Sequence, residues 1–376
     1  MEYITVKELF KITKGKKVEE IDYKNENSIR YIQIDDLRNN NNIKHCENIN
    51  KYVIAKKEDI IIAWDGANAG TIGFGIEGAI GSTLAILRKE NKEMDTEFCG
   101  LFLRSKSAYL REKCTGATIP HIQRRALEDI KIPKISLNKQ IEIKNIINKA
   151  QELIDKRKEQ IQDLDELVKS QFIEMFGEPI KNTKGWDKVK LSALGEWKTG
   201  GTPSRTNSDY FKGGIPWLSS GELNNKYCFG SNEHITEDAI KNSSAKLIEK
   251  ESLLLGMYDT AALKSTINMV ECTCNQAIAY SKLNNSVVNT VYVYYCIQMG
   301  KDFYKSQQRG VRQKNLNLTM IKDLEIIMPP LELQNKFIDS IKQIDKLKFE
   351  MEKSLKELED NFNALMQKAF NGELFN

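Results

Sequence analysis

The chain of 376 residues repeats itself at a spacing of 194 residues, and this repeat limits its fold more than any other feature. The stretch "LEDIKIPKISLNKQIEI" (residues 127–143) aligns with "IKDLEIIMPPLELQNKF" (residues 321–337), and Gln140 falls on Gln334. A long internal period defines the architecture before any local pattern does. We therefore predict two copies of one unit, each an α/β domain followed by a long helix.

Upstream of these stretches the offset drifts. Residues 28–37 parallel residues 214–223 at a spacing of 186, and residues 59–66 parallel residues 252–259 at 193. Insertions and deletions in the surface loops of a duplicated module would produce such a drift. The short runs "DIIIAW", "LAILR", "SLLLGMY" and "VVNTVYVYY" lie between Gly and Asn turns, and this pattern predicts strands with inserted helices.

Apolar residues recur at alternating spacings of four and three over residues 143–175, and again over residues 337–369. This pattern is the a/d seam of a coiled coil. Each pattern of about 35 residues would span roughly 50 Å as a helix. One small domain cannot bury so long a stripe, so we predict that the two helices pair antiparallel. The seam positions chosen from this pattern are Ile147, Ile154, Ile161, Leu164, Val168, Ile341, Met351, Leu355, Leu358 and Phe362.

Proline and glycine mark the expected helix boundaries. Pro133 and the Pro329–Pro330 pair should end the strand before each helix, since proline cannot continue a ladder. Gly177 and Gly372 should cap the helix ends. The predicted fold class is α+β, with two mixed α/β domains related by an internal repeat and joined by two long helices in an antiparallel coiled coil. The expected boundaries are residues 1–134, 135–180, 181–328 and 329–376.

Charge is distributed unevenly along the chain. The net charge is +4, but residues 137–178 and 331–376 each carry two more acidic than basic side chains, so the remainder carries +8. A basic excess confined to the globular parts indicates contact with a polyanion there.

No apolar run reaches eighteen residues and the first segment has no apolar stretch typical of a signal peptide, so we expect a cytoplasmic protein. The seven cysteines are scattered, and only Cys272 and Cys274 are close together. Free thiols in a reducing compartment are therefore expected. One Cys-x-Cys pair with three histidines makes a poor zinc site, and we predict no metal and no cofactor.

Catalytic motifs are missing from the sequence. There is no phosphate-binding Gly-Lys-Ser/Thr loop, and "GTIGFG" (residues 70–75) has the wrong spacing for a dinucleotide fingerprint. No Asn/Asp-Pro-Pro-Tyr/Phe tetrapeptide of an amino-methyltransferase occurs, and His45, His121 and His234 lie far apart. We therefore predict that the chain is not an enzyme.

Polar clusters in the loops of both copies instead suit contact with phosphates and base edges. Each loop alone also fits an ordinary solvated turn, but recurrence in both copies favours DNA. Trp64 and Trp217 fit core positions better than base stacking. The predicted DNA-contacting residues are Lys14, Lys16, Lys17, Gln33, His121, Gln123, Arg124, Arg125, Lys198, Thr202, Ser204, Arg205, Ser219, Ser220, Arg309, Arg312, Gln313, Lys314 and Asn315.

Three strings of the second copy carry a resemblance to a known family: "GGTPSR" followed by "GIPWLSSGEL", then "CNQAIAY", then "QKNLNLTMIKDLEIIMPPLELQNKF" before the last helix. Together they resemble the specificity subunits of type I restriction-modification systems. The first copy matches more loosely, because Lys134 replaces the second proline and its opening loop lacks "GGTPS". The resemblance covers essentially the whole chain.

That resemblance implies two target-recognition domains, each reading one half of a split double-stranded DNA site. It also implies that the helices separate the domains and dock modification (methyltransferase) subunits, which would methylate adenine from S-adenosylmethionine. A restriction motor-nuclease subunit would join for cleavage, and none of this chemistry would reside in the present chain. The alternative from the residues alone is a coiled-coil adaptor whose globular halves bind protein, and salt-dependent DNA binding would separate the two.

Overall fold

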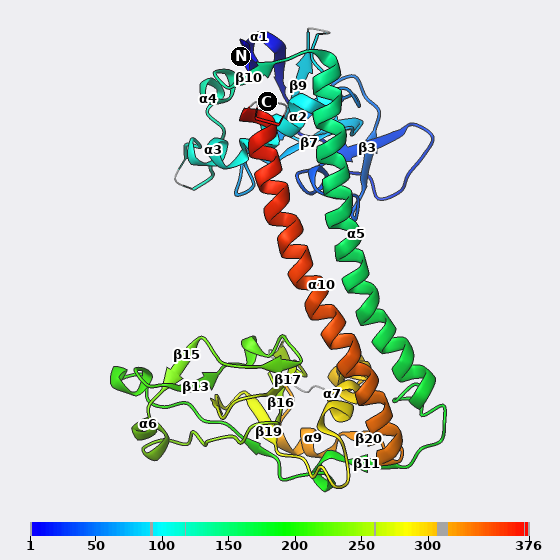
Figure 1. Ribbon diagram of the computed structural model, residues 1–376, viewed down its shortest axis with the longest axis vertical. Helices are drawn as coiled ribbons and strands as arrows, with labels where there is room; N and C mark the ends of the chain where they lie inside the picture. The colour runs from blue at the N-terminus through cyan, green and yellow to red at the C-terminus, as the bar shows by residue number, and fades with distance from the viewer. Residues whose placement is uncertain are drawn as a thin grey trace. The chain divides into compact units, whose positions relative to one another are not determined.

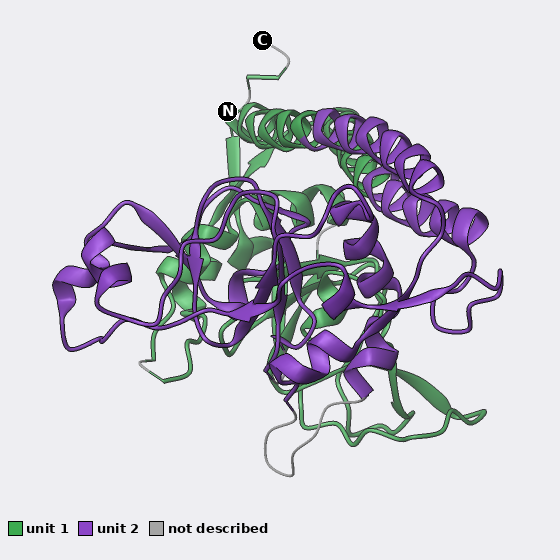
Figure 2. Cartoon of the chain, turned by 90° about the horizontal axis from the view of Figure 1, so that it is seen from below, with its two compact units in different colours: residues 1–158, 353–376 green, residues 159–352 purple. Residues whose placement is uncertain are grey.

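The computed structural model describes residues 2–90, 93–116, 118–258, 261–306, 315–371 and 373–374. The chain divides into two compact units (Figure 2). Unit 1 comprises Met1–Lys158 and Lys353–Asn376, and unit 2 comprises Glu159–Glu352. Each unit holds one α/β domain together with part of both long helices.

The α/β domain of unit 1 precedes the first long helix (Figure 1). Its elements, in chain order, are β1 (Glu2–Thr5), α1 (Val6–Leu9), β2 (Phe10–Lys14), β3 (Ser28–Ile32), η1 (Asp35–Leu37), β4 (Lys44–Glu47), β5 (Ile54–Ala55), β6 (Ile60–Ala63), β7 (Ile72–Phe74), β8 (Gly78–Ile80), β9 (Leu84–Lys89), α2 (Thr96–Ser105), α3 (Ser107–Glu112), α4 (Arg124–Glu128) and β10 (Lys131–Lys134). The long helix α5 (Leu137–Phe176) follows and continues into unit 2.

The α/β domain of unit 2 lies between the two long helices in the sequence. Its elements are β11 (Lys188–Lys190), η2 (Leu191–Ala193), β12 (Lys198–Thr199), η3 (Ser208–Phe211), β13 (Ile215–Leu218), η4 (Ser220–Glu222), β14 (Tyr227–Cys228), β15 (Glu233–Ile235), α6 (Glu237–Lys241), β16 (Leu253–Gly256), β17 (Ser265–Asn268), β18 (Thr273–Cys274), β19 (Ile278–Ser281), α7 (Thr290–Met299), α8 (Lys301–Ser306), α9 (Leu318–Asp323) and β20 (Glu325–Ile327). The second long helix, α10 (Leu331–Asn371), ends in unit 1.

The strand order of the two units repeats. Unit 1 has a sheet β2-β9-β6-β7, and unit 2 has the matching order β12-β19-β16-β17 with β14 added at one edge. In the smaller sheets β3 pairs parallel with β8, as β13 does with β18. The pair β1-β10 corresponds to β11-β20. The internal repeat predicted from the sequence is thus present in strand order and in strand direction.

One predicted strand is a helix. The run "VVNTVYVYY" contains the start of α7, because the Asn289 side chain caps the helix by accepting a hydrogen bond from the Val291 backbone N–H. Along α7, Tyr292, Val293, Cys296 and Ile297 are buried at helical spacing against the core of unit 2. Packing of this face outweighs the strand preference of its β-branched and aromatic residues.

Proline did not end the strand in the first copy. Pro133 lies inside β10, opposite Tyr3 of β1. A two-stranded ladder leaves both strands with an open edge, and edge strands are where proline is tolerated. The predicted C-cap at Gly177 is confirmed, since α5 ends at Phe176 and Gly177 has a left-handed φ of 78°. Gly372 lies outside the described residues.

The two long helices pack against each other along the predicted seam. All ten seam positions chosen from the sequence are buried or half-buried, whereas Leu153 and Leu167 beside them are half exposed. Within unit 2 the ion pair Lys348–Asp165 and the hydrogen bond Ser340–Gln171 join the helices. Residue numbers rise along one helix as they fall along the other, so the pairing is antiparallel.

The ends of the long helices contribute to the domain cores as well as to the seam. In unit 1, Ile143 and Ile147 of α5 and Phe370 of α10 join the apolar cluster under α2, where the rings of Phe370 and Phe102 meet edge-on at 5.2 Å. In unit 2, Phe172 of α5 and Phe337 of α10 meet at 5.6 Å inside the larger cluster. Each α/β domain therefore packs on both helices through its own core.

Helices long and apolar enough to cross a membrane do not occur among the residues described. The seven cysteines are free thiols, and five of them are buried. Burial raises the pKa of the Cys99 and Cys272 thiols to about 12, which keeps them protonated and unreactive.

Candidate nucleic-acid interface

One loop in each unit brings the predicted contact residues together. In unit 1 this is the β8–β9 loop (residues 81–83). The Gly81 N–H donates to the Ile32 carbonyl at 3.3 Å, beside Gln33, and the Trp64 N–H donates to the Thr83 carbonyl at 2.7 Å. At the base of the loop the Gly15 N–H donates to the Leu84 carbonyl at 2.8 Å. The segments that carry Lys14 to Lys17, Gln33 and Trp64 thus meet at one end of the main sheet.

The second predicted cluster of unit 1 reaches the same place. Asp65 and His121 form an isolated antiparallel bridge, and the Ile122 N–H donates to the Trp64 carbonyl at 2.9 Å. The Lys14 ammonium lies 2.7 Å from the Asp65 carboxylate. His121 is exposed, and its Nε2 lies 2.8 Å from the Thr115 hydroxyl. Lysine, carboxylate, hydroxyl and imidazole therefore form one polar surface.

Gln123, Arg124 and Arg125 continue this surface into α4. Gln123 is the exposed residue that precedes the helix. The Arg124 guanidinium pairs with Glu128 at 2.7 Å, whereas Arg125 is 92% exposed and lies 3.6 Å from Asp129. Arg125 is thus the more available of the two guanidinium groups. Lys16 and Lys17 are also exposed.

In unit 2 the equivalent loop joins β18 to β19 (residues 275–277). The Asn275 N–H donates to the Leu218 carbonyl at 2.9 Å, beside Ser219, and the Met257 N–H donates to the Ala277 carbonyl at 2.9 Å. The Leu316 N–H then donates to the Met257 carbonyl at 2.8 Å, which places Asn315 in a bridge with Tyr258. The Gly200 N–H also donates to the Ile278 carbonyl at 3.1 Å, and together these links reproduce the backbone links of unit 1.

The glycine pair of "GGTPS" allows its loop to approach two segments closely, the end of β18 at Gly200 and the segment around Ser244 at Gly201. A Cβ on Gly200 would lie 2.2 Å from the Cys274 carbonyl oxygen, and one on Gly201 would lie 2.3 Å from the Ser244 hydroxyl. This approach places Thr202 beside Gln276, and the Thr202 hydroxyl donates to the Gln276 side-chain carbonyl. This bond fixes the orientation of the exposed Gln276 amide. Its NH2 group then faces away from Thr202.

The serines and Arg205 have partners within the unit. The Ser219 hydroxyl donates to Glu222 at 2.7 Å, and Ser220 is half-buried at the start of η4. Arg205 pairs with Glu233 through both terminal nitrogens, at 2.8 and 2.7 Å. These hydrogen bonds raise the pKa of Arg205 and lower the pKa of Glu233.

The guanidinium of Arg205 also covers the rings of Phe211 and Trp217, 4.3 and 5.1 Å from their centroids. Trp217 is buried, and its indole N–H donates to the Gly201 carbonyl at 3.0 Å, as its predicted core role requires. Arg205 thus holds the loop in place, and a base edge would have to displace Glu233 to reach it.

The remaining predicted residues are more scattered. Ser204 is exposed and shares a hydrogen bond with Thr206, and Lys198 pairs with Glu196 at 2.9 Å opposite Tyr280. Arg309, Arg312, Gln313 and Lys314 lie outside the described residues.

Sequence reasoning missed the residues at the centre of each site. Asp65, Thr83, Tyr258 and Gln276 were not selected, although the repeat already aligned the ends of the strands before Asp65 and Tyr258. Position directly after a buried strand was the available signal, because such residues lie at the edge of the sheet with the loops.

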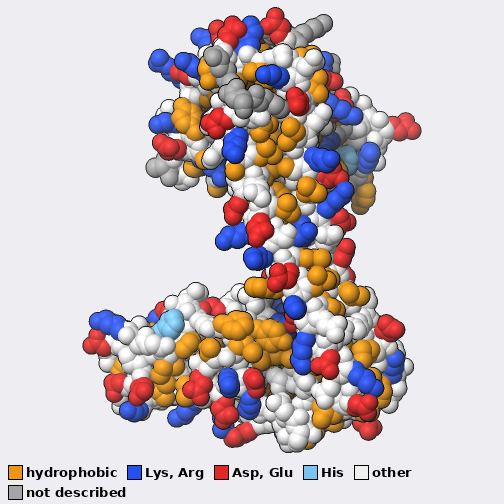
Figure 3. Space-filling model, viewed as in Figure 1, with side chains coloured by type: hydrophobic (Ala, Val, Ile, Leu, Met, Phe, Trp, Pro, Cys, Tyr) orange, Lys and Arg blue, Asp and Glu red, His pale blue; other side chains and the backbone are white. Residues whose placement is uncertain are grey.

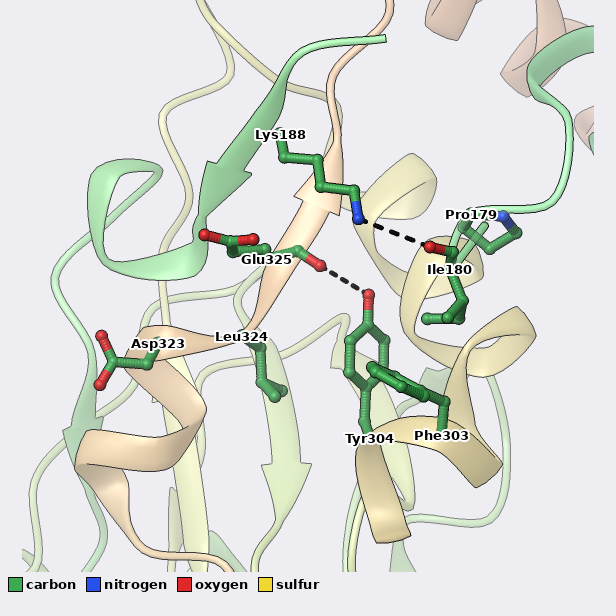
Figure 4. A pocket seen from close by; sticks show the side chains of 8 residues that line it. All are labelled: Pro179, Ile180, Lys188, Phe303, Tyr304, Asp323, Leu324 and Glu325. Atoms are coloured by element: carbon green, nitrogen blue, oxygen red, sulfur yellow. Dashed lines mark hydrogen bonds between the residues drawn. The ribbon is translucent and has the colours of Figure 1, made fainter. Parts of the chain in front are cut away.

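A small pocket elsewhere in unit 2 fits a nucleic acid poorly (Figure 4). It has a volume of about 210 Å³ and lies beside the segment that leaves α5. The Tyr304 hydroxyl donates to the Glu325 carbonyl at 2.7 Å. Two acidic residues, Asp323 and Glu325, line it with one lysine, Lys188, so the pocket has no basic excess to attract a phosphate.

Surface charge is mixed on the face shown in Figure 3, where basic and acidic side chains alternate over both units. No group of three or more His, Cys, Asp and Glu side chains is placed to hold a metal ion in the described part of the chain. Among the residues described, the two sites offer hydrogen-bonding chemistry, with more lysine and arginine in unit 1 and more hydroxyl and amide groups in unit 2.

The model of the type I restriction modification DNA specificity domain matches the chain twice, over residues 1–165 and 183–360. The chain belongs to this family. Both matches include one α/β domain and much of the helix that follows, so the family's domain is the repeated unit found in the sequence and the fold.

Relatives in this family cover the whole chain. The type I restriction enzyme MjaVIII specificity subunit of Methanocaldococcus jannaschii is 24% identical over 99% of this chain and 92% of its own length. The crystal structure of the type I restriction-modification S subunit from M. genitalium aligns over 98% of this chain and 96% of that chain, with 16% identity and a TM-score of 0.55. A chain from a study of complex assembly and conformational transition of the type I R-M system aligns over 99% and 98%, with 15% identity and a TM-score of 0.63. The fold is thus that of specificity subunits.

Proposed function

We propose that this chain is the DNA-reading subunit of a type I restriction-modification complex and that each unit reads one half of a bipartite site. The observation that carries the proposal is the convergence of polar loops on the β8–β9 loop of unit 1 and the β18–β19 loop of unit 2. Two similar recognition domains on one chain suit a target with two half-sites. The named relatives are specificity subunits, which supports the same conclusion.

The domain boundaries follow from this proposal. We assign residues 1–134 and 181–328 to the two target-recognition domains, and residues 135–180 and 329–376 to the helical spacer. We infer that the catalytic groups belong to partner subunits, a modification methyltransferase and a restriction motor-nuclease. One structural neighbour comes from work on the assembly of the type I R-M complex, which supports partners of this kind.

Within unit 2, Gln276 is the side chain best placed to read a base. It is exposed at the tip of the β18–β19 loop, and Thr202 fixes its amide. A side-chain amide offers a donor and an acceptor side by side, which matches N7 and N6 of adenine in the major groove. In unit 1 the exposed Gln123 could make the same pairing. Lys14, Lys16, Lys17 and Arg125 would contact phosphates.

Binding to duplex DNA should weaken steeply as the salt concentration rises. Each phosphate that a lysine or arginine neutralises adds about 0.9 to the slope of log affinity against log salt. Fluorescence anisotropy with the chain, alone and with its modification subunit, measures this slope. Binding with a flat salt response, or no binding even with the modification subunit, would favour the adaptor alternative.

A further inference from the structure

Two glutamines occupy the same position in the first turn of the long helices. Gln140 of α5 and Gln334 of α10 are 194 residues apart, and both are 0% exposed. A buried amide is costly unless its oxygen and nitrogen both find hydrogen-bond partners. Glutamine is a surface residue in most helices. Two copies of one buried glutamine therefore need an explanation.

The contacts of Gln140 join three segments of unit 1. Its side-chain oxygen accepts a hydrogen bond from the Asp95 N–H at 2.7 Å, and its nitrogen donates to the Ile135 carbonyl at 2.7 Å. Asp95 is the N-cap of α2, the helix that packs on β7 of the main sheet. One side chain thus ties the start of the long helix to the helix that covers the recognition domain.

Gln334 makes the same two bonds in unit 2. Its oxygen accepts from the Asn289 N–H at 2.9 Å, and its nitrogen donates to the Pro329 carbonyl at 2.8 Å. Asn289 is the N-cap of α7, the counterpart of α2. In both units the partners are backbone groups, one N–H that donates and one carbonyl that accepts. The joint between the long helix and the capped helix therefore does not depend on which side chains surround it.

Other polar contacts at the two joints differ. In unit 1, Lys144 reaches the carboxylates of Asp95 and Glu97 at 3.2 and 3.5 Å. In unit 2, the Asn289 amide donates to Asn335 at 3.3 Å. Of the contacts described at the two joints, the two glutamine hydrogen bonds are the ones formed by the same atoms in both units.

We propose that Gln140 and Gln334 are positioning residues that fix the angle between each recognition domain and its long helix, and thereby the gap between half-sites that the complex accepts. This inference rests on the proposed function. A helix of 40 residues is a lever of about 60 Å. A change of roughly 3° at the joint moves its far end by about 3 Å, close to the rise of one base pair.

The test replaces Gln140 or Gln334 by leucine, which is similar in size and forms neither bond. Gln162→Leu and Gln343→Leu are the controls, since these glutamines are exposed on the same helices. Each protein, with the modification subunit, selects binding sites from a random duplex pool. We expect unchanged half-site sequences, and about ten-fold less preference for the wild-type gap over gaps one base pair longer or shorter. The controls should keep the wild-type preference.

If folded leucine variants keep the wild-type gap preference, the inference is wrong. The glutamines would then contribute to packing alone. If the leucine variants do not fold, Gln140→Met and Gln334→Met take their place, because methionine is uncharged, unbranched like glutamine and able to adapt to the same space, and it forms neither bond. Hydrogen exchange of the Asp95 and Asn289 amides in the wild-type protein is a second measurement. Slow exchange supports the joint, and exchange at the rate of exposed loops overturns it. Failure of the wild-type protein to select any bipartite site would instead contradict the proposed function.

Discussion

Removal of one heptad from each long helix should shorten the accepted DNA gap by about three base pairs or abolish tight binding. Residues 155–161 of α5 and 353–359 of α10 are suitable, because the ion pair Lys158–Glu359 spans both segments and they face each other. Seven residues are about 10 Å of helix. The 3.5-residue seam stays in register, so the helices can still pair.

The expected loss of binding to the original site is large because the heptad deletion also changes the angle between the two recognition domains around the DNA axis. Three base pairs are about a third of a turn of B-DNA, so one recognition domain would face the wrong side of the original site. Selection from a random duplex pool measures the new gap. Removing four residues from each helix is the comparison variant, since it shifts the a/d register and should distort the winding of the spacer locally. Recovery of the original gap at full affinity would mean that the helices do not set the spacing.

Gln276→Ala should reduce base discrimination by about ten-fold to a hundred-fold. The loss should be confined to one or two neighbouring positions of one half-site, and the other half-site should be read as before. A bidentate side-chain contact contributes about 1–3 kcal/mol of discrimination. Gln123→Ala should have the reciprocal effect on the other half-site. Thr202→Val should weaken the same positions as Gln276→Ala by a smaller factor, because it releases the amide without removing it.

The control for these variants is Gln162→Ala, an exposed glutamine on α5. Competition binding with single-base substitutions across both half-sites distinguishes the outcomes. A uniform loss at all positions would assign Gln276 to phosphate contact. An unchanged profile would place base reading elsewhere in unit 2.

The sequence predicted the fold where the repeat constrains it. Ten seam positions and the duplicated domain follow from spacing, because burial and helix geometry repeat with fixed periods. The Gly177 cap follows from the residue type, since glycine adopts the left-handed conformation at a helix end. The sequence predicts a strand where α7 lies, because β-branched and aromatic residues favour strands and only packing against the core favours the helix. The sequence predicts a strand end at Pro133 because it does not reveal that β10 pairs with a single strand.

The candidate sites were predicted as separate loops and not as a single surface. Lys14, Gln33 and His121 are far apart in the sequence, and backbone bonds of the β8–β9 loop region bring them together. Arg205 shows the opposite case. Its residue type suggested base contact, but the bidentate pairing with Glu233 depends on a strand that lies 28 residues away.

Selection by the wild-type protein, bound to its modification subunit, from a pool of random duplex DNA tests the central claim most directly. If the chain carries two recognition domains, the enriched sequences should contain two short defined half-sites. A gap of fixed length, within which no base is preferred, should separate them. Enrichment of a single block, or binding with no sequence enrichment at all, would contradict the account.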